Sequence, residues 1–135
     1  MASEGKLRAK PLCIETWLAG TGGATRGEVA HNDGSNGVIN ADADADENFG
    51  IFLEDADSGK PVKVCTLGNC LAAAYDNGIT AGDWLIANAN GRVDGIGALT
   101  GGSQYPVAQA RSGSDAAGQL IPVFVNPHIA TKSAS

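Results

Sequence analysis

Short apolar runs separated by turn residues constrain this chain more than any other feature of its sequence. One stretch, DNGITAGDWLIANANGRVDGIG at residues 76–97, alternates two such runs with Asn, Asp and Gly. Runs of four to six residues are too short for an isolated helix, and no segment sustains the 3.6-residue apolar period of an amphipathic helix. Turn, strand, turn, strand is the pattern of β-hairpins, so the sequence predicts an all-β protein.

The same pattern recurs along the rest of the chain. The 19 glycines are about 14% of 135 residues, roughly twice the usual share, and indicate many tight turns. Residues 71–75, LAAAY, fit either a strand or one helical turn, because alanine favours helix but five residues are too few to hold one. The predicted strands cover residues 12–17, 28–31, 37–40, 49–53, 61–66, 83–87, 92–95, 105–110 and 120–125.

Three segments of the first half resemble three segments of the second half. The matching pairs are GEVAHNDG (27–34) with GDWLIAN (82–88), FGIFL (49–53) with YPVAQ (105–109), and GKPVKV (59–64) with GQLIPV (118–123). Their offsets are 55, 56 and 59 residues, so small loop insertions account for the differences. A Gly-rich β chain also aligns loosely with itself, which is the alternative to a true duplication.

Two copies of one β unit commonly bury their apolar faces in a single sandwich or barrel. We therefore predict a compact sandwich or barrel, built from two similar β units, over residues 27–126. Residues 1–26 match neither unit and are expected to form an extended N-terminal arm. Residues 127–135 are expected to form a flexible C-terminal tail.

Composition narrows the functional classes. Hydrophobic residues are 43% of the chain, but 22 residues are alanines, so we expect a thin core that gains stability from a partner. The net charge of −6 argues against sequence-independent nucleic-acid binding. No stretch approaches the ~20 apolar residues of a membrane span, and the first residues lack the apolar region of a secretory signal. We therefore expect synthesis in a cytoplasm and three free cysteines.

The segment DADADE has the ligand spacing of a calcium loop without its remaining residues. Asp42, Asp44 and Asp46 occupy alternate positions, but Glu47 stands where the loop needs Gly and Leu53 stands where it needs Glu. We interpret the segment as a solvated acidic turn. A hydrolase that uses these carboxylates as acid and base is the alternative, although an Asp-Ala repeat does not hold them at a fixed separation.

The remaining reactive residues do not form a recognisable site. Cys65 and Cys70 have an admissible zinc spacing but no second close pair, so with Cys13 they are expected to be structural or free thiols. No phosphate-binding loop or nucleophile elbow is present. We predict no catalytic residues, no metal and no cofactor, and therefore a protein that is not an enzyme.

The first residues concentrate both charge and apolar bulk. Lys6, Arg8 and Lys10 are three of the nine basic residues in an otherwise acidic chain. They fit either an arm that contacts an acidic neighbour or a solvated terminus. Trp17 fits equally an interface anchor or internal packing, whereas Trp84 heads the clearest strand and is expected in the core.

Three segments in order resemble the small head-decoration, or capsid cement, proteins of tailed bacteriophages. They are GIFLEDADSGKPVKVCTLG (50–68), NGITAGDWLIANANGRV (77–93) and YPVAQARSGSDAAGQLIPVFVNP (105–127). That family typically has a G-V-A-L-x-D-A-x-x-G-x-x-V-x-V segment, an I-x-A-G-D-x-V-x-x-x-x-x-G-x-V hairpin and a closing G-x-A-x-x-x-A-x-x-G-x-x-V-x-V unit. The match covers roughly residues 27–126, and Tyr105-Pro106 departs from it by replacing a usual Gly.

The resemblance implies a β sandwich or barrel that forms a homo-oligomer, a trimer rather than a dimer, on the outer surface of a phage head. Such a protein would be made in the host cytoplasm and would bind across neighbouring major capsid protein subunits of the expanded shell, stabilising it without nucleic-acid or membrane contacts. The expected capsid or sister-subunit contacts lie in the N-terminal arm: Leu7, Pro11, Leu12, Ile14 and Trp17. Deleting residues 1–18 is then expected to abolish capsid binding and leave the β fold intact.

The alternative function is a carbohydrate- or host-binding β module of a virion or cell surface. Such a module would need a platform of exposed aromatic side chains. The chain has three Phe, two Trp and two Tyr, and several of these must fill the core.

Overall fold

The structure is a computed structural model that describes residues 11–32, 37–41, 44, 47–96, 102–128 and 130–132. These residues form eleven strands and one 3-10 turn, and none of their helical segments is long and apolar enough to span a bilayer. The elements are β1 (Pro11–Ala19), β2 (Val29–Asn32), β3 (Gly37–Asn40), β4 (Asn48–Phe52), β5 (Pro61–Ala73), β6 (Trp84–Ala87), η1 (Ala89–Gly91), β7 (Val93–Gly95), β8 (Gly102–Gln104), β9 (Ala108–Ala110), β10 (Leu120–Val125) and β11 (Ala130–Lys132). The all-β prediction is confirmed.

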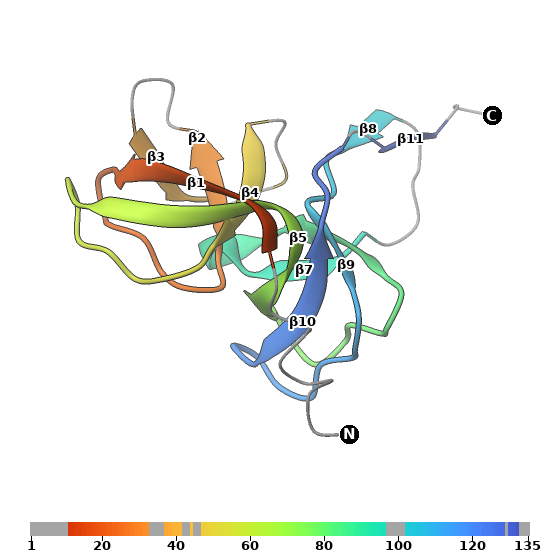
Figure 1. The fold of residues 1–135 in the computed structure, drawn as a ribbon. Coiled ribbons are helices and arrows are strands. Elements are labelled where there is room, and N and C mark those ends of the chain that lie inside the picture. The colour runs from red at the N-terminus through yellow and green to blue at the C-terminus, as the bar shows by residue number, and fades with distance from the viewer. Residues whose placement is uncertain are drawn as a thin grey trace.

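Nine strands form one continuous sheet in the order β1-β3-β2-β4-β5-β10-β9-β6-β7. Strand β1 also pairs with β5, which closes the first five strands into a barrel. At the other end, a bridge between Ala74 and Val93 brings β7 back to the end of β5. Figure 1 shows β1, β3, β2 and β4 on one side of the molecule and β9 and β10 on the other, with β5 passing through both groups.

Strand β5 is long enough to serve two barrels. Its first part alternates buried and exposed side chains, with Val62 and Val64 inside and Pro61 and Lys63 outside, as a period of two requires. It then continues to Ala73, where its second part pairs with β10. The ambiguous residues 71–75 are therefore strand as far as Ala73, because pairing with β10 overrides the helical preference of alanine.

The strand registers confirm the duplication. Pairs in the first half recur in the second half at a constant offset for each strand. The equivalent pairs are Ala30–Asn40 and Leu85–Gly95 (offset 55), Phe52–Val64 and Ala110–Val123 (offsets 58 and 59), and Trp17–Val62 and Ala72–Ile121 (offsets 55 and 59). Since registers are set independently for each strand, agreement of three ladders is not a loose self-alignment of Gly-rich sequence.

Two of the sequence expectations change. The middle offset is 58 rather than 56. Phe52 pairs with Val64, and Ala110 pairs with Val123, which is the residue equivalent to Val64, so Phe52 and Ala110 are equivalent. The repeat also begins earlier than residue 27. Strand β1, expected within an N-terminal arm, is a strand of the first barrel and corresponds to the second part of β5. We define the first repeat as residues 11–66 and the second repeat as residues 67–125.

The C-terminal segment also contains a strand. Ala130–Lys132, which falls within the tail expected at residues 127–135, pairs with Gly102–Gln104 of the second repeat. Neither three-residue strand was predicted, because segments this short carry too few residues for the alternation that indicates a strand.

The two barrels have separate cores. The first barrel is filled by one phenylalanine and by alanines and valines: Ala19, Ala24, Ala30, Val38, Phe52, Val62 and Val64. The second core contains the interior of the second barrel together with four residues that face outward from the first: Val29, Ala41, Ile51 and Cys65. The outer face of the first repeat therefore packs against the second repeat, and this contact is the junction between them.

Candidate interaction surface

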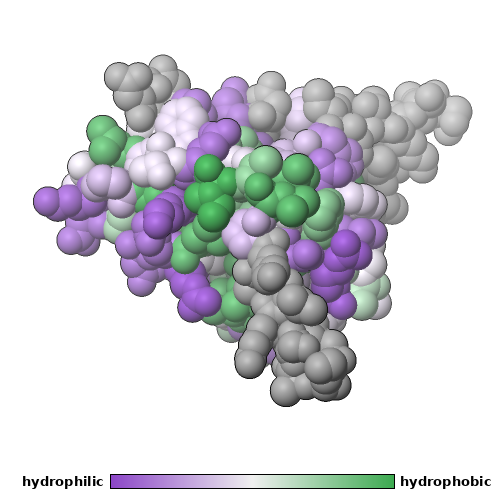
Figure 2. All heavy atoms as spheres, viewed as in Figure 1, coloured by the Kyte–Doolittle hydropathy of each residue, from purple (hydrophilic) through white to green (hydrophobic). Residues whose placement is uncertain are grey.

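The largest exposed hydrophobic side chains gather on one strand. Leu12, Ile14 and Leu18 of β1 are 70%, 50% and 49% exposed. Ile14 and Leu18 lie on the outer side of the first barrel, because the inner side of β1 holds Trp17 and Ala19. Leu12 lies beyond an irregularity in the β1–β5 register at Cys13, and it is the most exposed of the three. Figure 2 shows hydrophobic residues gathered on this face of the molecule, where β1 lies nearest the viewer in Figure 1. Large apolar side chains exposed on one face are typical of a protein–protein contact.

The structure separates the predicted contact residues into two groups. Leu12 and Ile14 are on this exposed face, and Pro11 is half-buried opposite Gly68 of β5. Trp17 points the other way. Its ring lies 5.3 Å from that of Phe49 against the first core, and its Nε1 donates to Glu15 at 2.9 Å. Leu7 lies outside the described residues.

Sequence reasoning missed Leu18, the third member of the exposed face. The alternation Leu12, Ile14, Thr16, Leu18 is visible in the sequence, but it identifies a face only once residues 11–19 are known to be a strand.

Of the three aspartates in the acidic segment, the structure describes Asp44. The Asp44 carboxylate accepts a hydrogen bond from the Tyr105 amide at 2.9 Å, which links a loop of the first repeat to the second. Burial raises the pKa of Asp44, and that amide hydrogen bond opposes the rise. Asp42 and Asp46 lie outside the described residues. Within the described residues, no three His, Cys, Asp or Glu side chains come together as metal ligands would.

All three cysteines are free thiols, and two of them meet at the junction of the repeats. Cys65 and Cys70 are buried, whereas Cys13 is exposed. A hydrogen bond between the two buried thiols lowers the pKa of Cys65 and raises that of Cys70. Cys65 Sγ also lies 3.4 Å from the carbonyl oxygen of Leu67. The pair is part of the internal packing of β5.

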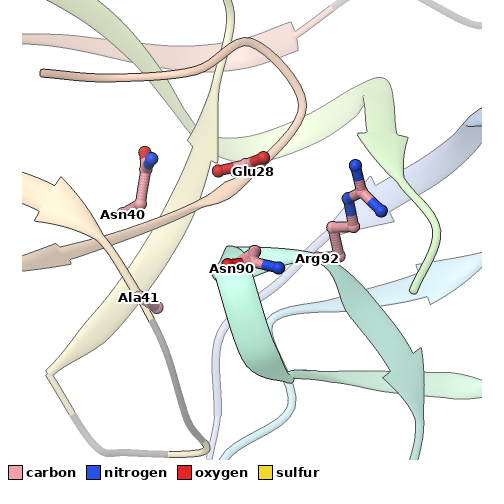
Figure 3. A pocket seen from close by; sticks show the side chains of 5 residues that line it. All are labelled: Glu28, Asn40, Ala41, Asn90 and Arg92. Atoms are coloured by element: carbon pink, nitrogen blue, oxygen red, sulfur yellow. The ribbon is translucent and has the colours of Figure 1, made fainter. Parts of the chain in front are cut away.

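A polar cavity of about 410 Å³ lies between the repeats. Figure 3 shows Glu28, Asn40 and Ala41 of the first repeat on one side and Asn90 and Arg92 of the second on the other. Burial raises the pKa of Glu28, and the charge of Arg92 partly offsets this. Arg92 Nε is buried and has no hydrogen-bond partner among the described residues. The backbone approaches closely here, because a Cβ at Gly91 would lie 2.9 Å from the carbonyl oxygen of Ala41.

The second repeat has a cavity at the equivalent position, but no counterpart of Asn90 and Arg92 lines it among the described residues. A cavity of about 360 Å³ is lined by Gly78, Asp83, Asp94, Gly95 and Ile96. Three of these residues, Asp83, Gly95 and Ile96, lie 55 positions after Glu28, Asn40 and Ala41. The first cavity is lined by residues of both repeats, whereas the described lining of the second cavity comes from the second repeat alone.

The outer face of the second repeat carries aromatic side chains. Trp84, which we expected in the core, is only partly buried and meets the His128 ring edge-on at 4.7 Å. Phe124 is also partly exposed, with the Arg111 guanidinium 5.3 Å from its ring centroid. Leu85 rather than Trp84 enters the core, because successive strand residues face opposite sides and Leu85 faces inward.

No protein-family model matches this chain, and no curated protein matches it. Among solved structures, the chain is similar to the N-terminal base of the head fiber protein gp8.5 of bacteriophage phi29. The TM-score is 0.62 at 15% sequence identity, over 84% of this chain and 95% of that chain. At this identity the comparison shows that the two proteins share a fold.

Proposed function

We propose that this protein is a decoration, or cement, protein of a tailed-bacteriophage head. It binds the outer surface of the capsid across neighbouring major capsid protein subunits, as a homo-oligomer and most simply as a trimer, and it stabilises the shell. The observation that carries the proposal is the fold shared with the N-terminal base of a phage head fiber protein. The resemblance of three sequence segments to decoration proteins supports it independently.

The exposed face of β1 supplies the contact. Leu12 and Ile14 are large, apolar and at least half exposed, so burying them against a capsid protein removes apolar area from water at ~25 cal/mol per Å². Many copies bind one shell, so each contact can be modest and the assembly still gains substantial stability.

The test is co-sedimentation with expanded phage heads that lack this protein, comparing wild type with the double variant Leu12→Ser/Ile14→Ser. Both side chains are exposed, so the variant is expected to fold normally and to bind heads at least 10-fold more weakly. Tyr75→Ser is the matched control, since Tyr75 is 36% exposed and lies outside β1. Equal binding by wild type and the double variant would exclude the β1 face as the capsid contact.

The alternative function, a carbohydrate- or host-binding module, finds support in the partly exposed Trp84 and Phe124. Aromatic faces of this kind suit sugar rings as well as protein partners. Saturable glycan binding that is lost in Phe124→Ala, together with no binding to heads, is the result that favours this alternative.

A further inference from the structure

The junction between the repeats is a head-to-tail contact, and each of its two sides has a counterpart on the same chain that neither repeat covers among the described residues; His128 contacts Trp84 at the edge of one of them. The junction joins the outer face of the first repeat to the end of the second barrel. Because the strands of the two repeats correspond through their registers, the outer face of the second repeat and the end of the first barrel carry the corresponding strand positions. We compare these positions in turn.

The first comparison concerns a backbone contact. The Ala73 amide donates to the Gly27 carbonyl at 2.8 Å, and a Cβ at Gly27 would lie 2.6 Å from Leu120 Cδ2. Gly82, 55 positions after Gly27, is exposed and has open space where a Cβ would lie. The counterparts of Ala73 and Leu120 in the first repeat are Leu18 and Pro61, a β1–β5 pair that is also exposed.

The second comparison concerns the outer faces of the two repeats. The residues of the first repeat that enter the junction are fully buried, whereas those at the same positions of the second repeat are only partly buried. The equivalent residues are Val29 and Trp84, Ala41 and Ile96, Ile51 and Gln109, and Cys65 and Phe124. The second repeat thus presents larger side chains, two of them aromatic, where the first repeat presents a buried contact.

The third comparison concerns the ends of the two barrels. Cys70, Ala72 and Val107 of the second barrel are buried by the junction core. At the equivalent positions of the first barrel stand Glu15, Trp17 and Phe49, of which Glu15 is exposed and the two aromatic residues are partly exposed. The two surfaces that correspond to the sides of the junction therefore both contain aromatic side chains, and aromatic residues are enriched at protein–protein interfaces.

Charge provides a fourth, independent indication. Arg111 occupies the position of Leu53, which packs against the junction core. Phe124 occupies the position of Cys65, which contacts Cys70 in the junction. Glu15 corresponds to Cys70. A contact that repeated the junction would therefore bring Arg111 and Phe124 of one molecule close to Glu15 of another, which pairs opposite charges.

We propose that two copies of this chain bind head to tail and reproduce the internal junction between them. The second-repeat surface (Gly82, Trp84, Ile96, Gln109, Arg111 and Phe124) of one copy contacts the first-repeat surface (Glu15, Trp17, Leu18, Phe49 and Pro61) of the next. The equivalent cavity of the second repeat is then walled by the neighbouring copy. Contacts of this kind generate closed rings when the rotation between units closes. This inference deepens the oligomer part of the proposed function.

The test uses the charge pair, because Glu15 and Arg111 are exposed and their reversal leaves both cores unchanged. Molar mass is measured by light scattering for the full chain, with no phage heads present. Wild type is expected to be an oligomer. Glu15→Arg and Arg111→Glu are each expected to reduce the mass toward that of the 13.6 kDa protomer, and the double variant is expected to recover the oligomer. Asp115→Arg, an exposed charge change outside both surfaces, is the control.

A mixture of the two single variants separates head-to-tail contact from other arrangements. Each single variant alone places like charges at its own contact. In an equimolar mixture, every contact between one copy of each variant pairs opposite charges, either in the native order or reversed, so the mixture is expected to form oligomers in which the two variants alternate. A wild-type monomer, single variants that keep the wild-type mass, or a mixture that stays monomeric would each overturn the proposal. Head binding is measured separately, so the proposed capsid function can survive that result.

Discussion

At the scale of single residues, the two repeats provide matched controls within one chain. Gly27 and Gly82 occupy equivalent positions with positive φ angles of 86° and 94°. They differ in their surroundings, because Gly27 lies in the junction and Gly82 has open space beside it. A comparison of the two positions separates backbone strain from packing.

We predict that Gly82→Ala lowers the free energy of unfolding by about 1 kcal/mol, the cost of placing a Cβ in a left-handed conformation. Gly27→Ala is expected to cost at least about 1 kcal/mol more, since its Cβ would lie 2.6 Å from Leu120 Cδ2 and 3.1 Å from the Ala73 nitrogen. Urea denaturation of both variants measures the difference. Equal losses would mean that the junction does not pack tightly at Gly27.

Glu28 links stability to pH. It is 9% exposed, and its pKa in the folded state lies above the ordinary value of 4.5 because burial outweighs the favourable charge of Arg92; Asp55 contributes further in the upward direction. In the range between the unfolded and folded pKa values, the folded protein binds more protons. The free energy of unfolding therefore falls as pH rises through that range.

We predict that Glu28→Gln removes this part of the pH dependence above pH 4.5, and that Arg92→Leu enlarges it because the pKa of Glu28 rises further. Denaturant titrations at closely spaced pH values measure both effects. A wild-type stability that rises through this range, with no change in slope in Glu28→Gln, would contradict the assignment.

At the scale of elements, β1 is the strand that closes the first barrel. It pairs with β3 in parallel and with β5 in antiparallel orientation. Residues 11–18 lie in this strand, so the structure argues against the expectation that residues 1–18 can be removed without affecting the β fold. Its inner side also contributes Trp17 and Ala19 to the first core.

We predict that deleting residues 1–18 opens the first barrel and abolishes its cooperative unfolding, because β3 and β5 each lose a neighbouring strand. Thermal unfolding followed by circular dichroism tests this. The double variant Leu12→Ser/Ile14→Ser, which keeps the strand, is the control and is expected to unfold within a few degrees of wild type. A truncated protein that retains the wild-type transition would show that β1 is dispensable.

Most strands were predictable because alternation and turn residues are local signals. The exceptions have non-local causes. The second part of β5 is a strand because it pairs with β10, about 50 residues further along the chain, and β8 and β11 exist only as each other's partners. The role of β1 was not predictable, since its equivalence to the second part of β5 rests on register rather than on residue identity.

The candidate site was predictable only in part. Leu12 and Ile14 were identified from their apolar character, and Leu18 follows once β1 is known to be a strand. The second-repeat surface could not be identified, because Trp84 and Phe124 occupy positions whose equivalents, Val29 and Cys65, are buried. Whether an outward-facing apolar residue of a strand is buried or exposed depends on what covers that face of the strand, and this is decided by how the two repeats pack together.

At the scale of the whole molecule, two barrels share strand β5, and the surfaces at their free ends correspond in position to the two sides of the internal junction. Leu12 and Ile14 of β1 add further exposed apolar side chains. A protein with several exposed apolar and aromatic surfaces, and no three-ligand metal cluster among the described residues, is suited to assembly with neighbours.

The measurement that tests the central claim most directly is binding of the purified protein to expanded phage heads that lack it, followed by heating of the decorated heads. The account predicts saturable binding at a fixed ratio to the major capsid protein, and decorated heads that survive to a higher temperature than bare heads. A folded protein that does not bind the heads, or that binds them without changing their survival, would contradict the assignment as a cement protein.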